Sequence, residues 1–361
     1  MLTDNSFYAE DVNYVLCQSG IDWEKFRNKS VFITGATGLI GAFAVNVLSQ
    51  ADEKFGLGIK LHLLIRSETK AQRLFGKRVE NFILHTGDVE TIGGIDTDVD
   101  YFIHAASQTS SKGFVDTPVE TFRTSVAGTM NMLEAARSSG TKKFIFLSTM
   151  EVYGTPSDDR KISEDMKVSM LSSNVRNCYP ISKIAAENLC CDYASEYGMD
   201  IAVFRLTQTF GPGIDYNDGR VFAEFARCAV EDRDIVLKTK GETKRSYLYT
   251  ADAVAAILMV LTKENHGFEI YNAANEDTYC SIYEMAQLVA KECAGGRISV
   301  RIEEPKDIAG FGYAPTLCMN LDTQKLRRLG WNPSVGLKEM FVNLCRSMEE
   351  TSENRNIELK Y

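Results

Sequence analysis

The sequence predicts an α/β fold in which a doubly wound parallel sheet is followed by a smaller C-terminal α/β domain. Short apolar runs recur between residues 30 and 206 and alternate with longer stretches whose apolar residues have helical spacing. That alternation is typical of βαβ units. The short runs are apolar at nearly every position, as expected for parallel strands that helices cover on both faces.

The expected elements follow in chain order. Residues 1–29 are predicted to form an amphipathic helical lead-in, and residues 30–210 the sheet domain. Residues 211–361 are predicted to form mainly the second domain, with segments near 247–275 returning to the first. The expected strands are 30–34, 59–65, 81–85, 100–105, 142–148, 201–206 and, further along the chain, 268–274.

Composition excludes several classes of protein. The chain has 361 residues, 44% of them hydrophobic, and a formal net charge of -9, which argues against a nucleic-acid-binding surface. No apolar run is long enough to span a membrane, and the first thirty residues are too acidic for a signal peptide, so we expect a cytoplasmic protein. We expect no metal site, because the four histidines, at positions 62, 85, 104 and 266, are far apart in sequence.

A glycine-rich segment joins the first expected strand to a helix. In "TGATGLIG", Gly35 suits a tight turn, Gly38 allows a pyrophosphate to approach the backbone, and Gly41 allows close helix packing. The helix N-terminus then offers free N–H groups and the positive end of its dipole. The pattern favours a dinucleotide-binding, Rossmann-type domain over a plain turn.

Residues after the next two strands bear on the choice of dinucleotide. Arg66 follows the second strand, where an NAD-binding domain usually has an acidic residue, so we expect it to pair with the 2′-phosphate of NADP. The alternatives are a solvated arginine and NAD as the cofactor. Asp88 and Val89, after the third strand, are placed to meet the adenine.

Tyr179 and Lys183 are four residues apart in a predicted helix and therefore lie on one face of it. A nearby ammonium and an oxidised nicotinamide are expected to lower the pKa of the tyrosine enough for it to act as a base near pH 7. This pair lies some thirty residues after "STMEVYG", which contains Thr149 and Glu151.

With these motifs in order, the chain resembles the extended short-chain dehydrogenases/reductases, the nucleotide-sugar epimerase/dehydratase family. The resemblance covers nearly the whole chain and includes "GDV", "HAAS", "GTMNMLEAAR", "YPISK", "FGPG" and "LRRLGWNP". It implies that Thr149, Tyr179 and Lys183 are catalytic, with Lys183 also holding the nicotinamide ribose. It implies that the cofactor is contacted by the glycine segment and by the end of the fourth strand, namely by Gly35, Thr37, Gly38, Leu39, Ile40, Gly41, Ala105, Ala106 and Ser107.

The resemblance also implies a substrate and a partner. The substrate would be a nucleotide-diphosphate sugar, or a related nucleotide-linked polyol or keto sugar, contacted by Gln208, Arg220 and Arg245. Two helices, near residues 118–139 and 179–197, would form a four-helix bundle with those of a second subunit in a homodimer. The chain departs from the family at Ser125 and at Gln208, where asparagine is usual.

The reaction itself stays open at this point. Glu151 is either a base at a carbon next to a transient ketone or only a structural carboxylate, and Met150 excludes a dehydration that needs an acid at that position. We expect an enzyme of epimerase/dehydratase type that moves a hydride to and from NAD(P). The alternatives are an NADPH-dependent reductase of a nucleotide-linked keto sugar and a catalytically silent dinucleotide-sensing regulator.

Overall fold

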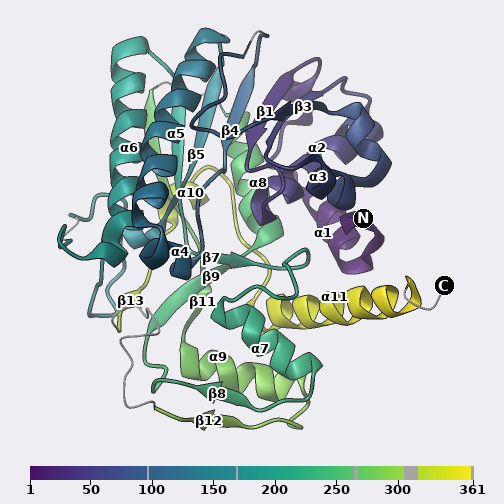
Figure 1. The fold of residues 1–361 in the computed structure, drawn as a ribbon, viewed down its shortest axis with the longest axis vertical. Coiled ribbons are helices and arrows are strands. Elements are labelled where there is room, and N and C mark those ends of the chain that lie inside the picture. The colour runs from purple at the N-terminus through teal and green to yellow at the C-terminus, as the bar shows by residue number, and fades with distance from the viewer. Residues whose placement is uncertain (96, 168–169, 264–266, 305–315, 359–361) are drawn as a thin grey trace.

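A parallel sheet of seven strands forms the centre of the structure (Figure 1). The structure is a computed structural model, and it describes residues 1–95, 97–167, 170–263, 267–304 and 316–358. The strand order is β10-β6-β5-β4-β1-β2-β3. The strands are β1 Ser30–Thr34, β2 Lys60–Ile65, β3 Ile83–Thr86, β4 Tyr101–His104, β5 Lys143–Thr149, β6 Ile201–Leu206 and β10 Phe268–Ala273. This arrangement confirms the predicted doubly wound α/β fold.

The order of the strands reverses beside β1. The chain runs from β1 outward to β2 and β3, then crosses back to place β4 on the other side of β1. In parallel sheets of this kind the carboxyl ends of the strands at such a reversal leave a crevice in which ligands bind. The residues that follow β1 and β4 are therefore the first place to look for a functional site.

Helices cover both faces of the sheet. On one face, α5 and α6 bury apolar side chains against β4, β5 and β6. On the other face, α2, α3 and α8 share one core with apolar residues of the sheet, including those of β1 and β2. The helices are α1 Ser6–Leu16, α2 Leu39–Phe55, α3 Glu68–Phe75, α4 Ser111–Asp116, α5 Pro118–Ser138, α6 Cys178–Tyr197, α7 Val221–Val230, α8 Thr250–Leu261, α9 Ile282–Leu288, α10 Gln324–Arg327 and α11 Leu337–Glu358. None of the helices in the described ranges has the length and apolar character that a membrane span requires.

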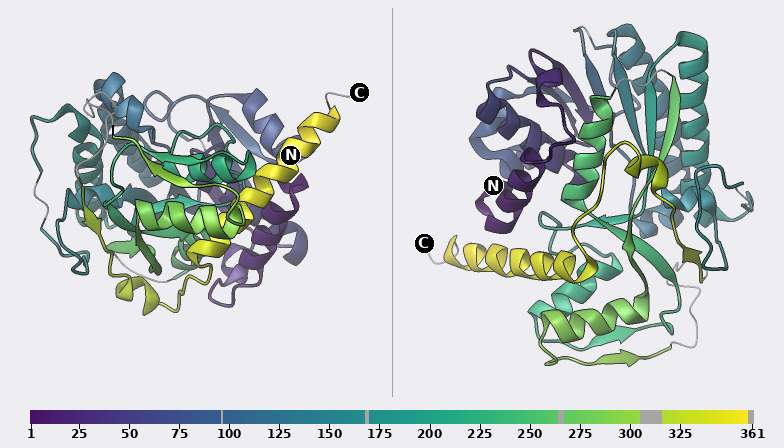
Figure 2. Two further views of the ribbon diagram at one scale, coloured as in Figure 1. Left: turned by 90° about the horizontal axis from the view of Figure 1, so that it is seen from below. Right: turned by 180° about the vertical axis from the view of Figure 1, so that it is seen from behind.

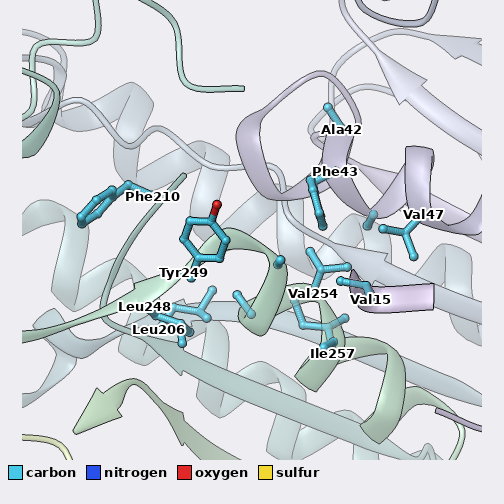
Figure 3. Close-up of a cluster of buried hydrophobic side chains, with 14 of the residues drawn as sticks. Val15, Ala42, Phe43, Val47, Leu206, Phe210, Leu248, Tyr249, Val254 and Ile257 are labelled. Atoms are coloured by element: carbon cyan, nitrogen blue, oxygen red, sulfur yellow. The ribbon is translucent and has the colours of Figure 1, made fainter. Parts of the chain in front are cut away.

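The N-terminal lead-in packs on the sheet domain through α1. Figure 3 shows Val15 of α1 beside Phe43 and Val47 of α2 and Val254 and Ile257 of α8, and all five side chains are buried. Burial of this apolar surface holds α1 in place.

The smaller lobe lies beyond the carboxyl ends of the sheet (Figures 1 and 2). It contains a four-stranded sheet, in which β9 pairs with β7, β11 and β13, and a two-stranded sheet of β8 and β12. The strands are β7 Gln208–Phe210, β8 Ile235–Leu237, β9 Lys244–Tyr249, β11 Asn275–Ser281, β12 Val300–Ile302 and β13 Cys318–Met319. After β9 the chain returns to the main sheet domain as α8 and then as the edge strand β10.

Candidate active site

The glycine segment closes tightly on the end of β4. Gly35 follows β1 with φ +64°, and a Cβ on it would lie 2.8 Å from backbone atoms of Ala105 and Ala106. A Cβ on Gly41 would overlap the Gly35 carbonyl. Only glycine fits either position, because the first needs a left-handed backbone and both need the absence of a side chain.

Gly38 is the residue of this segment that stays open. It caps the N-terminus of α2, is exposed, and a Cβ on it would meet only the Gly35 carbonyl oxygen, at 3.2 Å. A seventeen-residue helix begins here with no side chain shielding its first N–H groups, which is the geometry that accepts a pyrophosphate. Thr37, Leu39 and Ile40 are half-buried beside it. The residues present therefore fit a dinucleotide.

The other residues that were assigned to the cofactor lie at or beyond the carboxyl ends of β2, β3 and β4. Arg66 is exposed directly after β2. Asp88 is half-buried and accepts a hydrogen bond from the Glu90 backbone N–H at 3.1 Å. Val89 is buried against α5, and Ser107 is half-buried three residues after β4.

Thr149, Tyr179 and Lys183 converge where β5 ends and α6 begins. Thr149 is the last residue of β5, and Tyr179 and Lys183 lie one turn apart in α6. The Lys183 Nζ atom donates to the Leu147 carbonyl oxygen at 2.7 Å and lies 4.5 Å from the ring centroid of Phe146. The structure thus brings the three predicted catalytic side chains together, and all three are buried.

In the protein without a cofactor, the pKa of Tyr179 is raised. Burial raises the pKa of this phenol well above its usual range, and the negative charge of Glu151 raises it further, whereas hydrogen bonding to Thr149 and Ser107 lowers it. The expected depression of this pKa requires Lys183 together with an oxidised nicotinamide. In the protein alone, loss of solvent outweighs the neighbouring groups. Tyr179 is therefore protonated in the protein by itself.

Lys183 lies near a buried ion pair between Glu187 and Arg205. Burial lowers the pKa of Lys183 to about 8, while the carboxylate of Glu187, one turn further along α6, opposes this effect. Glu187 accepts hydrogen bonds from Ser148 and from the guanidinium of Arg205, with a shortest Arg205–Glu187 distance of 2.7 Å. Lys183 is thus charged at neutral pH.

Glu151 has a partner that the sequence did not reveal. The Arg176 Nη1 atom lies 2.9 Å from Glu151 Oε2, and the Arg176 guanidinium also lies 4.9 Å from the ring centroid of Phe114. Phe114 in turn stacks on Tyr179, with 4.3 Å between ring centroids and 7° between planes. Three segments distant in sequence, around Phe114, Glu151 and Arg176 to Tyr179, therefore meet around the phenol, and no periodic pattern signals such a meeting.

Three polar groups with buried, unpartnered atoms share one face of the smaller sheet. Arg245 and Tyr247 are alternate residues of β9, and Gln208 of β7 pairs with Tyr247. Arg245 Nε, Tyr247 Oη and Gln208 Oε1 have no hydrogen-bond partner among the described residues. Buried polar groups left in this way indicate a place where a polar ligand completes them.

Arg220 and three of the histidines already have partners within the protein. The guanidinium of Arg220 is paired with the carboxylate of Asp218, with a shortest distance of 2.6 Å. His62 and His85 lie side by side at 3.1 Å, and His104 bonds to hydroxyl groups of β1 and α5. His266 lies outside the described residues. Within the described ranges, no group of three potential ligands could hold a metal ion.

Comparison with known proteins identifies a related sequence and structures of similar fold. UDP-glucuronic acid decarboxylase 1 of Xenopus tropicalis is 30% identical over 318 residues, which cover 88% of this chain and 71% of the relative. The fold resembles that of UDP-glucose 4-epimerase from Thermotoga maritima, solved with UDP-glucose, with a TM-score of 0.74, 23% identity and coverage of 90% and 99%. It equally resembles dTDP-glucose 4,6-dehydratase from Streptomyces venezuelae, solved with NAD, with a TM-score of 0.74, 20% identity and coverage of 90% and 98%.

A family model spans most of the chain. Residues 31–274 match the model of the NAD dependent epimerase/dehydratase family. The matched segment begins at the first strand of the main sheet and ends just after its edge strand β10. The chain therefore belongs to the NAD dependent epimerase/dehydratase family and is a nucleotide-sugar modifying enzyme of that type.

Proposed function

We propose that this enzyme oxidises a ring hydroxyl of a nucleotide-diphosphate sugar to a transient ketone, alters the neighbouring carbon, and then reduces the ketone again. The observation that carries the proposal is the convergence of Thr149, Tyr179, Lys183 and Glu151 beside an open glycine segment. A bound NAD-type dinucleotide would supply the hydride acceptor and, in its oxidised form, a positive charge. Every other task falls to side chains of the chain itself.

Tyr179 takes the proton of the sugar hydroxyl in this proposal. Its raised pKa keeps it protonated in the protein alone, so positive charge must be added nearby before it can accept a proton. Lys183, whose pKa of about 8 leaves it charged at neutral pH, contributes from the same face of α6. Thr149 holds the reacting oxygen, which restricts proton transfer to one hydroxyl.

Glu151 acts on the carbon next to the ketone. A ketone acidifies the hydrogens on its neighbouring carbons, so a carboxylate suffices as the base there. The residue before it, Met150, is buried, and its sulfur accepts a hydrogen bond from Thr207 at 3.2 Å. An acid at position 150 that protonates a departing hydroxyl is thereby excluded. Chemistry that needs only one base beside the ketone is favoured.

The face of β7 and β9 that bears Gln208, Arg245 and Tyr247 is the proposed nucleotide site. Arg245 Nε offers a charged donor that suits a diphosphate, and Gln208 Oε1 offers an acceptor. Arg220 would join them only by leaving Asp218. The Xenopus and Thermotoga proteins carry UDP-sugars in their names, and we propose a substrate of the same class here.

The test of this function is hydride transfer. Wild-type protein mixed with UDP-glucose or UDP-glucuronate and NAD should produce the absorbance of the reduced cofactor, at least transiently. Tyr179→Phe should lower this rate by about a thousandfold or more, because it removes the proton acceptor. Tyr197→Phe, at the exposed end of the same helix, should leave the rate unchanged. A Tyr179→Phe variant that keeps more than a tenth of the activity would contradict the assignment.

One observation favours a second candidate. Arg66 is exposed at the end of β2, where its charge suits the 2′-phosphate of NADP. An enzyme that regenerates its own cofactor gains nothing obvious from NADP, whereas a net reductase of a nucleotide-linked keto sugar would consume NADPH. Preference for NADPH together with net reduction of a keto sugar would favour this reductase.

A further inference from the structure

Arg176 has more donors than the protein uses. It lies in the short 3-10 helix Val175–Asn177 just before α6, and its side chain is 17% exposed. One terminal nitrogen pairs with Glu151 at 2.9 Å. Its Nε atom, by contrast, is buried and has no hydrogen-bond partner among the described residues. A buried guanidinium N–H without an acceptor is costly and indicates a missing anion.

The guanidinium is also held in one place. It lies against Phe114, which stacks on the catalytic Tyr179. The thiol of Cys178, the residue before Tyr179, is 3.3 Å from the Phe114 carbonyl oxygen and links the same two segments. The free donor is therefore fixed beside both the proton acceptor and the proposed base. An anion that reaches it must belong to the reacting part of the sugar, not to the diphosphate.

We propose that Arg176 is a specificity-determining residue that binds a carboxylate on the sugar carbon next to the oxidised one, so that the preferred substrate is a nucleotide-linked uronic acid. This inference rests on the proposed function, because Glu151 defines which carbon lies nearby. Arginine offers a rigid fork that can hold one carboxylate on a terminal nitrogen and a second through Nε. Glu151 and the substrate carboxylate would thus share one cation.

Charge distinguishes this substrate from a neutral sugar. A carboxylate placed beside Glu151 alone would meet like charge at short range in a partly buried site, which disfavours binding. Arg176 removes that penalty and gains a charge-assisted hydrogen bond. An uncharged hydroxymethyl group has no comparable need for the guanidinium. Replacing Arg176 should therefore weaken binding of the acidic sugar strongly and binding of the neutral sugar only slightly.

The experiment compares two ligands in three proteins. Calorimetry at one fixed salt concentration measures UDP-glucuronate and UDP-glucose binding to NAD-loaded wild type, Arg176→Met and Arg160→Met. Arg160 is the control, because it is an exposed arginine that precedes Arg176 in the same connection and pairs with Asp158. Wild type should prefer UDP-glucuronate, and Arg176→Met should bind it about tenfold or more weakly while binding of UDP-glucose changes by less than about threefold. Arg160→Met should match wild type.

Other results would overturn the inference. Equal wild-type affinities for the two nucleotides, or an equal loss of both in Arg176→Met, would make Arg176 a structural partner of Glu151. If Arg176→Met does not fold, Arg176→Lys keeps the charge but not the fork, and an unchanged ratio of the two affinities would count against the proposal. Hydride transfer from UDP-glucose without any preference for the acid sinks this inference and leaves the proposed function intact. Selective binding of the acid through Arg176 without any hydride transfer would support this inference and contradict the proposed function.

Discussion

Individual residues of the site owe their properties to burial as much as to identity. Tyr179 keeps its proton because it is buried beside Glu151. Loss of solvent also lowers the pKa of Lys183, to about 8, which still leaves the ammonium charged at neutral pH. The two effects move the pKa values in opposite directions, so that each group lies closer to its uncharged form. Binding of a positively charged cofactor is expected to shift Tyr179 toward ionisation.

Arg66 gives the prediction for cofactor choice. NADPH should bind about tenfold or more tightly than NADH, because one exposed guanidinium can pair with the 2′-phosphate. Calorimetry on wild type and Arg66→Ala measures the preference, and Arg73→Ala, an exposed arginine of α3, is the matched control. Equal affinities in wild type, or a preference that survives Arg66→Ala alone, would contradict the assignment.

The sequence predicted a candidate site from residues that lie close together in sequence or follow strands. The placement of Tyr179 and Lys183 on one helix face follows from helical spacing, whereas Thr149 was assigned from the family resemblance. Arg176 and Phe114 could not be found in this way, because their contact with each other joins α4 to the segment before α6. The raised pKa of Tyr179 also depends on packing that no local pattern encodes.

Among the elements, the α1 helix is joined to the rest of the fold by buried carboxylates. Asp11 accepts a hydrogen bond from Tyr249 at 2.9 Å, and Tyr14 donates to Asp252 of α8 at 2.7 Å. Burial raises the pKa of Asp11 to about 7, and burial also raises the pKa of Asp252. The predicted lead-in is thus a helix whose attachment depends on protonation.

Asp11→Asn should remove part of the pH dependence of stability. Well below 3.8, the ordinary pKa of this carboxyl, the group is protonated in folded and unfolded chains alike. As the pH rises toward 7 the unfolded chain loses the proton while the folded chain keeps it, so wild-type stability falls across this window. The amide keeps an acceptor for Tyr249 without this penalty. Thermal unfolding should show Asp11→Asn more stable than wild type at pH 8, by about 5 °C, and no more stable at pH 4.

A variant that gains nothing at pH 8 relative to pH 4 would show that Asp11 is ionised in the folded protein. Asp4→Asn, near the same end of the chain but largely exposed, serves as the control and should change neither value.

On the scale of the whole molecule, α5 presents an apolar stripe to solvent. Val119, Phe122 and Met130 of this helix are 75%, 39% and 48% exposed, and α5 packs beside α6 on the outside of the sheet (Figure 2). The expected partner of this surface is a second copy of the chain, in which the same two helices complete a four-helix bundle.

Sedimentation or light scattering should find a dimer for wild type and a monomer for Met130→Glu, because a buried charge at the centre of the bundle is costly. Val236→Glu places the same charge on an exposed residue of β8 and should remain dimeric. A wild-type monomer at micromolar concentration would contradict the proposed bundle.

The fold was predictable at this scale because its strands are short, apolar and regularly spaced between helical stretches. The fold of the smaller lobe was less predictable from the sequence. Its strands β7, β8, β12 and β13 have three residues or fewer, too few to carry a periodic signal. Pairing with β9 or with each other, not local pattern, defines them.

In the proposed function, hydride transfer and chemistry at the neighbouring carbon are separate tasks, the first of Tyr179 and the second of Glu151. The most direct test runs wild type and Glu151→Gln in heavy water with the proposed substrate UDP-glucuronate, while cofactor absorbance and deuterium in the sugar are followed together. Glu151→Gln should still transfer hydride but lose incorporation of deuterium at the carbon next to the ketone, because only the base has been removed. Deuterium uptake by the variant at the wild-type rate would contradict the account and make Glu151 a structural partner of Arg176.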